Sequence, residues 1–368
     1  MGKQRGEKTG QRRKLREVLR INRSVIIIFL VVFILLLIVV IGNIFDSFSN
    51  SKTSQAFVCG DGSFYDSCSL KSPFFCEDGK LVEKASICGC VDGLKKNGDS
   101  CISEYHVGEK IISLKYLLDG EEDYINFTVY KGLTDYLSSL PSSISYFGEE
   151  RLFRVDFKFK RINEQKQREF LLPLVSEIQN RAFDKEDQFR IAVSLVQNIP
   201  FGFSGKNISV LNGEIVNYSK YPYEVLYDYR GVCGEKSELL AFLLREIGYK
   251  IVLFYYPLEN HEALGVGCPL RASGDGSDYC FIEASGPSIV TDNEIEYVGG
   301  IKLKSNPEVM MISEGISLSK NLQEYDDAYE FKKLRSILER GARLDSSEDK
   351  KLRDLKNKYG LIEFYGLD

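Results

Sequence analysis

Residues 230–249 read RGVCGEKSELLAFLLREIGY, and this segment decides the fold. Its apolar residues recur at helical spacing on one face, at Leu239, Leu240, Leu243, Leu244 and Ile247. Gly248 can adopt the left-handed backbone conformation that commonly ends a helix. The pattern therefore predicts a helix from about Cys233 to Gly248 with one buried face.

The predicted helix places Cys233 in its first turn. The free backbone N–H groups and the positive end of the helix dipole favour a thiolate over a thiol there, which creates a nucleophile. Gly231 and Gly234 leave room for a substrate to approach. The alternative is a small buried residue without chemistry, because cysteine is often used in that way.

Three strands are predicted after this helix, at 251–256, 261–267 and 279–285, with a turn at 257–260. His261 begins the second strand, and it is one of only two histidines in the chain, the other being His106. Glu283 lies in the third. A helix nucleophile, a strand imidazole and a strand carboxylate in this order predict a catalytic triad of Cys233, His261 and Glu283. His261 and Glu283 could instead be ordinary polar residues of a strand, and His106 is expected to be a surface or structural residue.

These residues, together with Lys236, Ser237, Arg245 and Tyr249, resemble the transglutaminase-like domain over roughly residues 180–300. The chain is more similar to the membrane-anchored archaeal branch than to the animal crosslinking enzymes. The resemblance implies an α+β, papain/transglutaminase-like core in which the cysteine helix packs on an antiparallel sheet. It also implies acyl transfer through a thioester, with Cys233 as nucleophile and His261 as general base and then acid. Glu283 stands where the family usually has Asp, and no cofactor is implied.

Two classes of function follow from this site. The first is a thiol enzyme that cleaves or transfers at an amide bond of a protein or peptide, with water or an amine as acceptor. Its oxyanion hole would use the Cys233 N–H and a second donor, for which Tyr221 and Tyr223 are candidates. The alternative is a catalytically inactive adhesion or assembly module. The absence of tryptophan, which the family often places near its histidine and its acid, supports that alternative.

The N-terminal region predicts a membrane anchor. Every residue from 25 to 41 is Val, Ile, Leu or Phe, and the apolar segment is too long for the core of a cleaved signal peptide. Nine basic residues against two acidic ones at 1–23 predict a cytoplasmic tail, a span at 24–45 that contacts lipid through residues 25–45, and an extracytoplasmic body. The total charge of −5 leaves −12 on that body, which argues against nucleic-acid binding.

The cysteines indicate disulfides, which form outside the cytoplasm. Six of the nine cysteines lie within 46–103 and can close three bridges, so this module is expected to be a structural stalk. A zinc site is the alternative, but the segment has one close cysteine pair and no histidine. Cys268 and Cys280 flank a glycine-rich loop between two predicted strands and are expected to pair. Cys233 is then the single free thiol.

The remaining segments are predicted as strands or helices from the spacing of their apolar residues. Residues 110–118 and 124–130 predict a hairpin, and the alternation at 151–160 predicts another strand, so 104–162 is expected to be a β-rich subdomain. Helical spacing at 163–198, with Asp184 as a cap, begins a transglutaminase-like domain at 163–305. Residues 306–368 are expected to carry two charged, solvated helices, at 325–340 and 347–358, with a capping box from Asp345 to Glu348.

Overall fold

The computed structural model describes residues 57–141, 153–203, 205, 207–209, 215–273, 276–294 and 302–361. The chain divides into two units, Met1–Ala56 and Phe57–Asp368. The predicted tail at 1–23 and span at 24–45 lie outside the described residues. None of the helices in the described ranges has the length and apolar character needed to cross a membrane.

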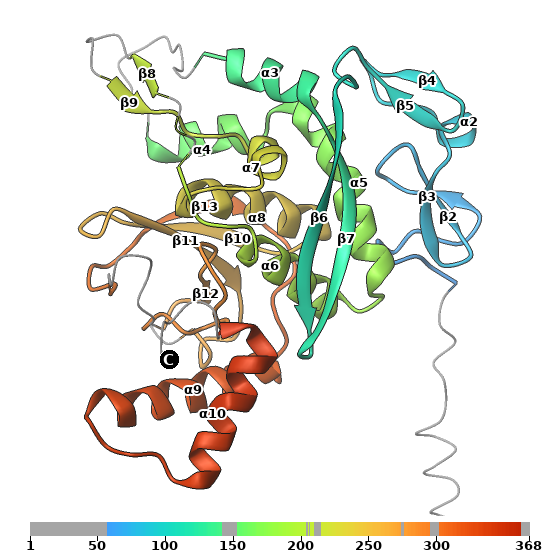
Figure 1. Ribbon diagram of the computed structural model, residues 1–368. Helices are drawn as coiled ribbons and strands as arrows, with labels where there is room; N and C mark the ends of the chain where they lie inside the picture. Colours follow the sequence, from blue (N-terminus) through green and yellow to red (C-terminus); the bar gives the residue numbers. More distant parts are fainter. Residues whose placement is uncertain are drawn as a thin grey trace, which may run out of the picture. The chain divides into compact units, whose positions relative to one another are not determined.

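The centre of the second unit is a helix packed on an antiparallel sheet (Figure 1). The helix is α8 (Cys233–Ile247), and it ends at Gly248 with φ at 114°. The sheet has the order β12-β11-β10-β13, with β10 at Ile251–Tyr256, β11 at His261–Gly267, β12 at Tyr279–Ile282 and β13 at Glu308–Ser313. The α+β arrangement expected of this segment is therefore present, and the third strand stops at Ile282.

Three further helices cover α8, and their buried side chains share its core. They are α5 (Gln165–Arg181), α6 (Lys185–Gln197) and α7 (Pro222–Asp228). Asp184 caps α6 as predicted, because its Oδ1 accepts a 2.8 Å hydrogen bond from the Glu186 N–H. Pro173 stands inside α5 without ending it. A short hairpin, β8 (Asn207–Ser209) and β9 (Ile215–Asn217), precedes α7.

The predicted hairpin is confirmed as β6 (Glu109–Leu118) and β7 (Glu121–Tyr130), followed by α3 (Lys131–Ser139). One face of the hairpin is buried, and its side chains pack against α6 and belong to the core that α6 and α8 share. The hairpin therefore has no separate core.

The strand predicted at 151–160 is wrong, because this segment forms the helix α4 (Arg154–Ile162). The alternating apolar and charged residues also have helical spacing, and they form two rows of side chains along α4. Val155, Phe159 and Ile162 pack on the main core, and the neighbouring row of Arg154, Lys158 and Arg161 forms ion pairs with α8 and β11. Tertiary pairing of those charges favours the helix, which the period-2 pattern alone does not reveal.

The cysteine-rich module is held by three disulfides, Cys59–Cys76, Cys68–Cys88 and Cys90–Cys101. All six sulfurs are used in these bonds, so the structure supports disulfides over the zinc alternative. The module contains β1 (Ser67–Cys68), β2 (Phe74–Glu77), β3 (Lys80–Glu83), α2 (Ala85–Cys88), β4 (Lys95–Asn97) and β5 (Ser100–Ile102).

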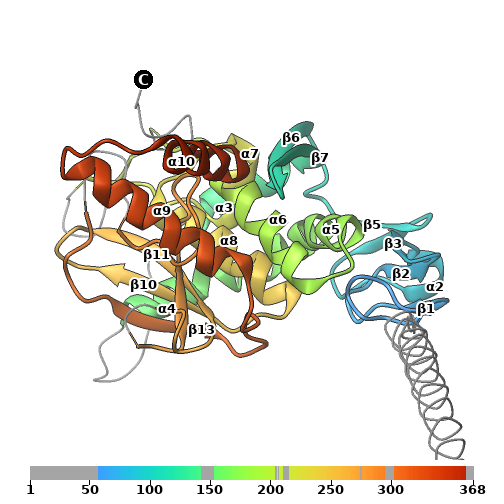
Figure 2. The same ribbon diagram turned by 90° about the horizontal axis from the view of Figure 1, so that it is seen from below.

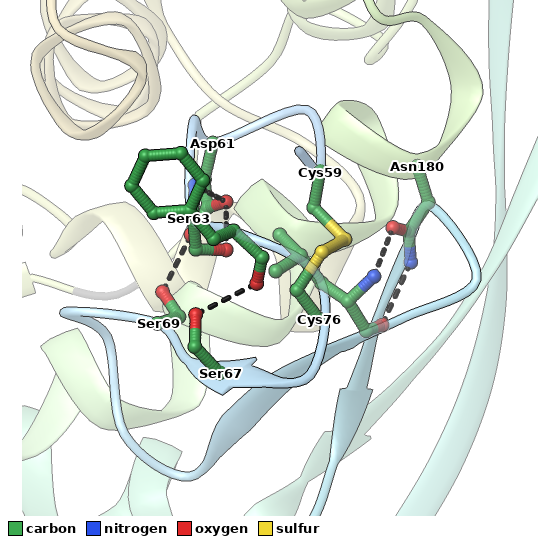
Figure 3. Close-up of a disulfide and its surroundings, with 9 residues drawn as sticks. Cys59, Asp61, Ser63, Ser67, Ser69, Cys76 and Asn180 are labelled. Atoms are coloured by element: carbon green, nitrogen blue, oxygen red, sulfur yellow. Dashed lines mark hydrogen bonds between the residues drawn. A yellow bond between two sulfur atoms is a disulfide. The ribbon is translucent and has the colours of Figure 1, made fainter. Parts of the chain in front are cut away.

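The module, which the sequence predicts to be a structural stalk, packs against α5. The Leu81 N–H donates to Asn180 Oδ1 at 2.7 Å, and Asn180 Nδ2 donates back to the Leu81 carbonyl at 2.9 Å. Figure 3 shows this pair beside the Cys59–Cys76 disulfide. Leu172 of α5 completes the small apolar core of the module.

The two charged helices are confirmed as α9 (Gln323–Glu339) and α10 (Ser346–Tyr359) (Figure 2). Asp345 caps α10. Both helices are less solvated than expected. Phe331 and Leu334 of α9 and Leu352 and Leu355 of α10 are buried together with Ile289, which follows β12. Arg335 also holds the buried Asp292 through two hydrogen bonds, of 2.8 and 2.9 Å.

Candidate active site

Cys233 is the first residue of α8, where backbone N–H groups have no partner within the helix. Glu235 fixes this helix start, because its carboxylate accepts from the backbone N–H groups of Val232, at 3.0 Å, and Lys220, at 2.8 Å. The Gly231 N–H donates a 3.2 Å hydrogen bond to the Pro200 carbonyl, which fixes the backbone just before the helix. Cys233 is the free cysteine, and its side chain is partly exposed.

His261 and Glu283 meet beside this helix start. His261 begins β11, and its Nε2 lies 2.8 Å from Glu283 Oε2. Glu283 follows β12, is 1 % exposed, and accepts a 2.7 Å hydrogen bond from the Ser285 N–H at its other carboxylate oxygen. The carboxylate is therefore fixed, and it orients the ring.

The imidazole of His261 also shares a hydrogen bond with the Cys233 side chain. Burial alone lowers the pKa of His261, but the hydrogen bonds and negative charges of Cys233 and Glu283 outweigh it and raise the pKa to about 10. The structure therefore brings together the three residues that the sequence selects, in the order thiol, imidazole and carboxylate.

A buried lysine connects the elements that carry these residues. Lys236 is fully buried one turn after Cys233, and its Nζ donates to the backbone carbonyls of Gln197, Ile199 and Ser285 at 3.3, 2.5 and 2.8 Å. Burial lowers the pKa of Lys236 to about 7, against the opposing attraction of Glu283 and Cys233. The lysine thereby ties the nucleophile helix to the end of α6 and to the segment that follows Glu283.

The side chain of Gln197 supports the same segment from α6. Its Nε2 donates to the Glu283 carbonyl at 2.8 Å and to Ser288 at 3.1–3.2 Å. Neither Lys236 nor Gln197 is predicted from the sequence as a support. Lys236 is part of the motif around Cys233, and nothing in the sequence near Gln197 indicates this contact.

Cys233 opens into a pocket of about 510 Å³ between α4, the start of α8 and the β10–β11 turn. The α4 wall carries Arg154, Phe157, Lys158 and Arg161, and the facing wall carries Tyr255, Asn260 and Glu262. The sequence did not predict this wall, because residues 151–160 were expected to form a strand. The signal that could have found it is the spacing of Arg154, Lys158 and Arg161, which places three cations on one helical face.

The ion pairs of this wall are largely buried. Lys158 Nζ lies 2.7 Å from Glu238 Oε1 and 2.5 Å from Glu262 Oε2, and Arg161 Nε donates to Glu238 Oε2 at 2.8 Å. The position next to these ion pairs, 234, requires a glycine, because a Cβ there would lie 2.4 Å from Glu262 Oε2. The residue after the nucleophile thus lets a fixed carboxylate approach the helix start.

The two candidate oxyanion donors do not line this pocket. Tyr223 is fully buried, and its hydroxyl accepts a 2.6 Å hydrogen bond from the Tyr130 N–H, away from Cys233. Burial of Tyr221 raises the pKa of its hydroxyl to about 12. The donors nearest the thiol are therefore the N–H groups of the first turn of α8.

His106 takes no part in the site. Its ring lies 4.2 Å from the Phe170 ring and 4.8 Å from the Tyr130 ring, and its Nδ1 accepts from the Ser103 N–H at 2.9 Å. It is a structural residue, as expected. Within the described ranges, His, Cys, Asp and Glu side chains form no group of three or more that could hold a metal ion.

The arrangement can perform nucleophilic chemistry at a carbonyl carbon. A partly exposed thiol is bonded to an imidazole, the imidazole is bonded to a fixed carboxylate, and free N–H groups lie at the helix start. The predicted Cys268–Cys280 bridge is present at the far end of β11 and β12, so Cys233 is the only one of the nine cysteines left as a thiol.

Comparison with known proteins gives limited information. No family model matches the chain, and no curated protein matches it. Among solved structures, calcium-bound LapG of Legionella pneumophila is 15% identical with a TM-score of 0.25, over 48% of this chain and 98% of that one. A second LapG structure is 15% identical with a TM-score of 0.24, over 51% of this chain and 98% of that one. The function proposed below therefore depends on the geometry of the site.

Proposed function

We propose that this chain is a thiol enzyme of transglutaminase-like type that cleaves or transfers at an amide bond of a protein or peptide, through a thioester on Cys233. The observation that carries the proposal is His261, whose imidazole is hydrogen-bonded to both the Cys233 thiol and the buried Glu283 carboxylate. A structural cysteine has no need of an oriented imidazole or of a second fixed residue behind it.

The chemistry follows from these contacts. His261 takes the thiol proton, and the Cys233 sulfur adds to the substrate carbonyl carbon, whose oxygen becomes an oxyanion beside the N–H groups of the helix start. The intermediate then expels the amine, which leaves with the proton from His261, and the thioester remains. Water or a second amine attacks the thioester, gives its proton to His261, and the sulfur leaves with that proton. Glu283 orients the ring throughout.

Alkylation of Cys233 by iodoacetamide as a function of pH tests the proposal. In the unmodified protein, rapid alkylation is expected well below the pH at which an ordinary cysteine, with its pKa of about 8.5, reacts. His261→Ala should shift the alkylation profile to higher pH, because the imidazolium that balances the thiolate is lost. Glu283→Gln should shift it less but impair turnover, because the amide orients the ring without stabilising its charge.

The matched control is His106→Ala, which removes the other histidine and leaves the site intact. A Cys233 that reacts like a free thiol and does not respond to His261→Ala would refute the enzyme and favour the inactive adhesion or assembly module. If the thiol does react, product analysis with and without an added primary amine separates hydrolysis from acyl transfer.

We also propose that residues 25–45 anchor the chain in a membrane, with 1–23 in the cytoplasm and the body outside. Support comes from the charge distribution of the sequence and from four disulfides, which persist in oxidising compartments. Protease added to intact cells should remove the body. A body that survives in intact cells and is cut only after lysis contradicts this orientation.

A further inference from the structure

The pocket beside Cys233 contains one cation, Arg154, that is only loosely paired. Its side chain is 42% exposed, and its Nη1 atom lies 3.5 Å from Glu262 Oε1. That separation is longer than a normal N–H···O hydrogen bond. Within the described part of the chain, no hydrogen bond from the Arg154 guanidinium is found, so its donors are available to a ligand.

The carboxylates of this pocket are already bonded. Glu262 Oε2 is held by Lys158 at 2.5 Å, Glu238 is shared by Lys158 and Arg161, and both oxygens of Glu235 accept from backbone N–H groups. An incoming carboxylate would therefore meet an arginine with available donors and acids whose charges are compensated. The pocket favours an anion over a cation at this position.

The guanidinium is also held in place before any ligand arrives. Its centre lies 3.5 Å from the centroid of the Tyr255 ring, which is the geometry of a stacked cation–π contact. Stacking on one face leaves the edge of the guanidinium open, and that edge matches a carboxylate with two parallel hydrogen bonds. Less side-chain entropy is then lost on binding than for an unsupported arginine.

Arg154 lies close to the reacting thiol. A Cβ on Gly234, the residue after Cys233, would be 2.4 Å from Glu262 Oε2, and the other oxygen of that carboxylate is 3.5 Å from Arg154. Cys233 and Arg154 also line the same pocket, so one bound peptide can contact both. We infer that Arg154 forms a subsite for an Asp or Glu side chain next to the amide bond that Cys233 attacks, so that the substrate is an acidic peptide. This inference rests on the proposed thiol chemistry.

The test uses peptide vinyl sulfones that differ only in the residue beside the reactive group, Glu, Gln or Lys. For the full-length protein, inactivation by the Glu probe is expected to be about fivefold faster than by the Gln probe, as for a partly exposed ion pair. The faster inactivation should come from tighter binding of the Glu probe. The rate constant for reaction of the bound probe with Cys233 should be the same for the Glu and Gln probes. Arg154→Glu should reverse the order, so that the Lys probe becomes the fastest.

Arg353→Glu on α10 is the matched control, because it makes the same charge change at an exposed arginine outside the pocket. It should keep the preference of the unmodified protein. Equal rates for the Glu and Gln probes, or a preference that survives Arg154→Glu, would overturn the subsite and leave the thiol enzyme standing. Failure of every probe to label Cys233 would overturn both the subsite and the proposed function.

Discussion

Replacement of the buried Lys236 by Met should change how the stability of the protein depends on pH. Burial lowers the pKa of this lysine from 10.5 to about 7, so the unfolded chain binds one more proton than the folded chain between these two values. The free energy of unfolding contributed by Lys236 therefore rises with pH in that window. A one-unit pKa shift corresponds to about 1.4 kcal/mol, which gives a rise of about 2 kcal/mol from pH 7 to pH 9 and little change below pH 6.

The assay is urea unfolding of the full-length protein, with disulfides intact, at pH 5, 6, 7, 8 and 9. Groups that titrate in both proteins cancel when the unmodified protein is compared with Lys236→Met. The free energy of unfolding of the unmodified protein minus that of the variant should stay level up to pH 6 and should grow by about 2 kcal/mol between pH 7 and pH 9. Below pH 6, the sign of this stability difference is set by two opposing effects. The methionine removes a buried charge, but it leaves three carbonyls without a donor.

Two comparisons make the result specific. The pKa of His261 is raised to about 10, so its contribution is complete below pH 6.5 and falls as pH rises toward 10. His261→Ala should therefore give a difference of the opposite slope, about 2 kcal/mol lost from pH 7 to pH 9. Lys350→Met, at an exposed position of α10, is the control for the loss of a lysine that is not buried. A difference for Lys236→Met that is constant from pH 5 to pH 9 would refute the reasoning.

Three further substitutions test the supports of the site and of the fold. Gly234→Ala should destabilise the protein by about 3 kcal/mol in urea unfolding, because the new Cβ displaces Glu262 from Lys158; a gain of about 1 kcal/mol from helix propensity alone would contradict this. Asn180→Leu should cost about 1–3 kcal/mol and speed proteolysis of the cysteine-rich module, since two hydrogen bonds to Leu81 are lost, and unchanged cleavage would argue that the module is held by other contacts. Asp184→Ala should cost about 1 kcal/mol through loss of the α6 cap, and an unchanged midpoint would argue against that cap.

Local patterns predicted much of the core. The cysteine helix, the three strands after it and the hairpin at 109–130 all have strong periodicity, which is set by which faces are buried. The same patterns selected Cys233, His261 and Glu283, and the structure places the three side chains in contact in that order. The pairing of Cys268 with Cys280 also followed from two adjacent strands with a short connection.

The failures share one cause, which is that the polar partner of a segment lies far away in the chain and is not identified by the local pattern. Residues 151–160 alternate like a strand, yet they form a helix because Lys158 and Arg161 find partners 77 or more residues away in the chain. The docking of the cysteine-rich module depends in the same way on Asn180, which lies 99 residues from Leu81.

The sequence by itself thus determined the elements whose side chains repeat with a clear period, and the chemical identity of the three candidate catalytic residues. Only the tertiary structure decided what surrounds those residues. The pocket wall and the position of Lys236 depend on burial of charge, which is unfavourable without a partner from a distant segment. The position of Arg154 depends on the Tyr255 ring of β10, about a hundred residues away in the chain. Periodicity records which face of a segment is buried, but it does not record which partner buries it.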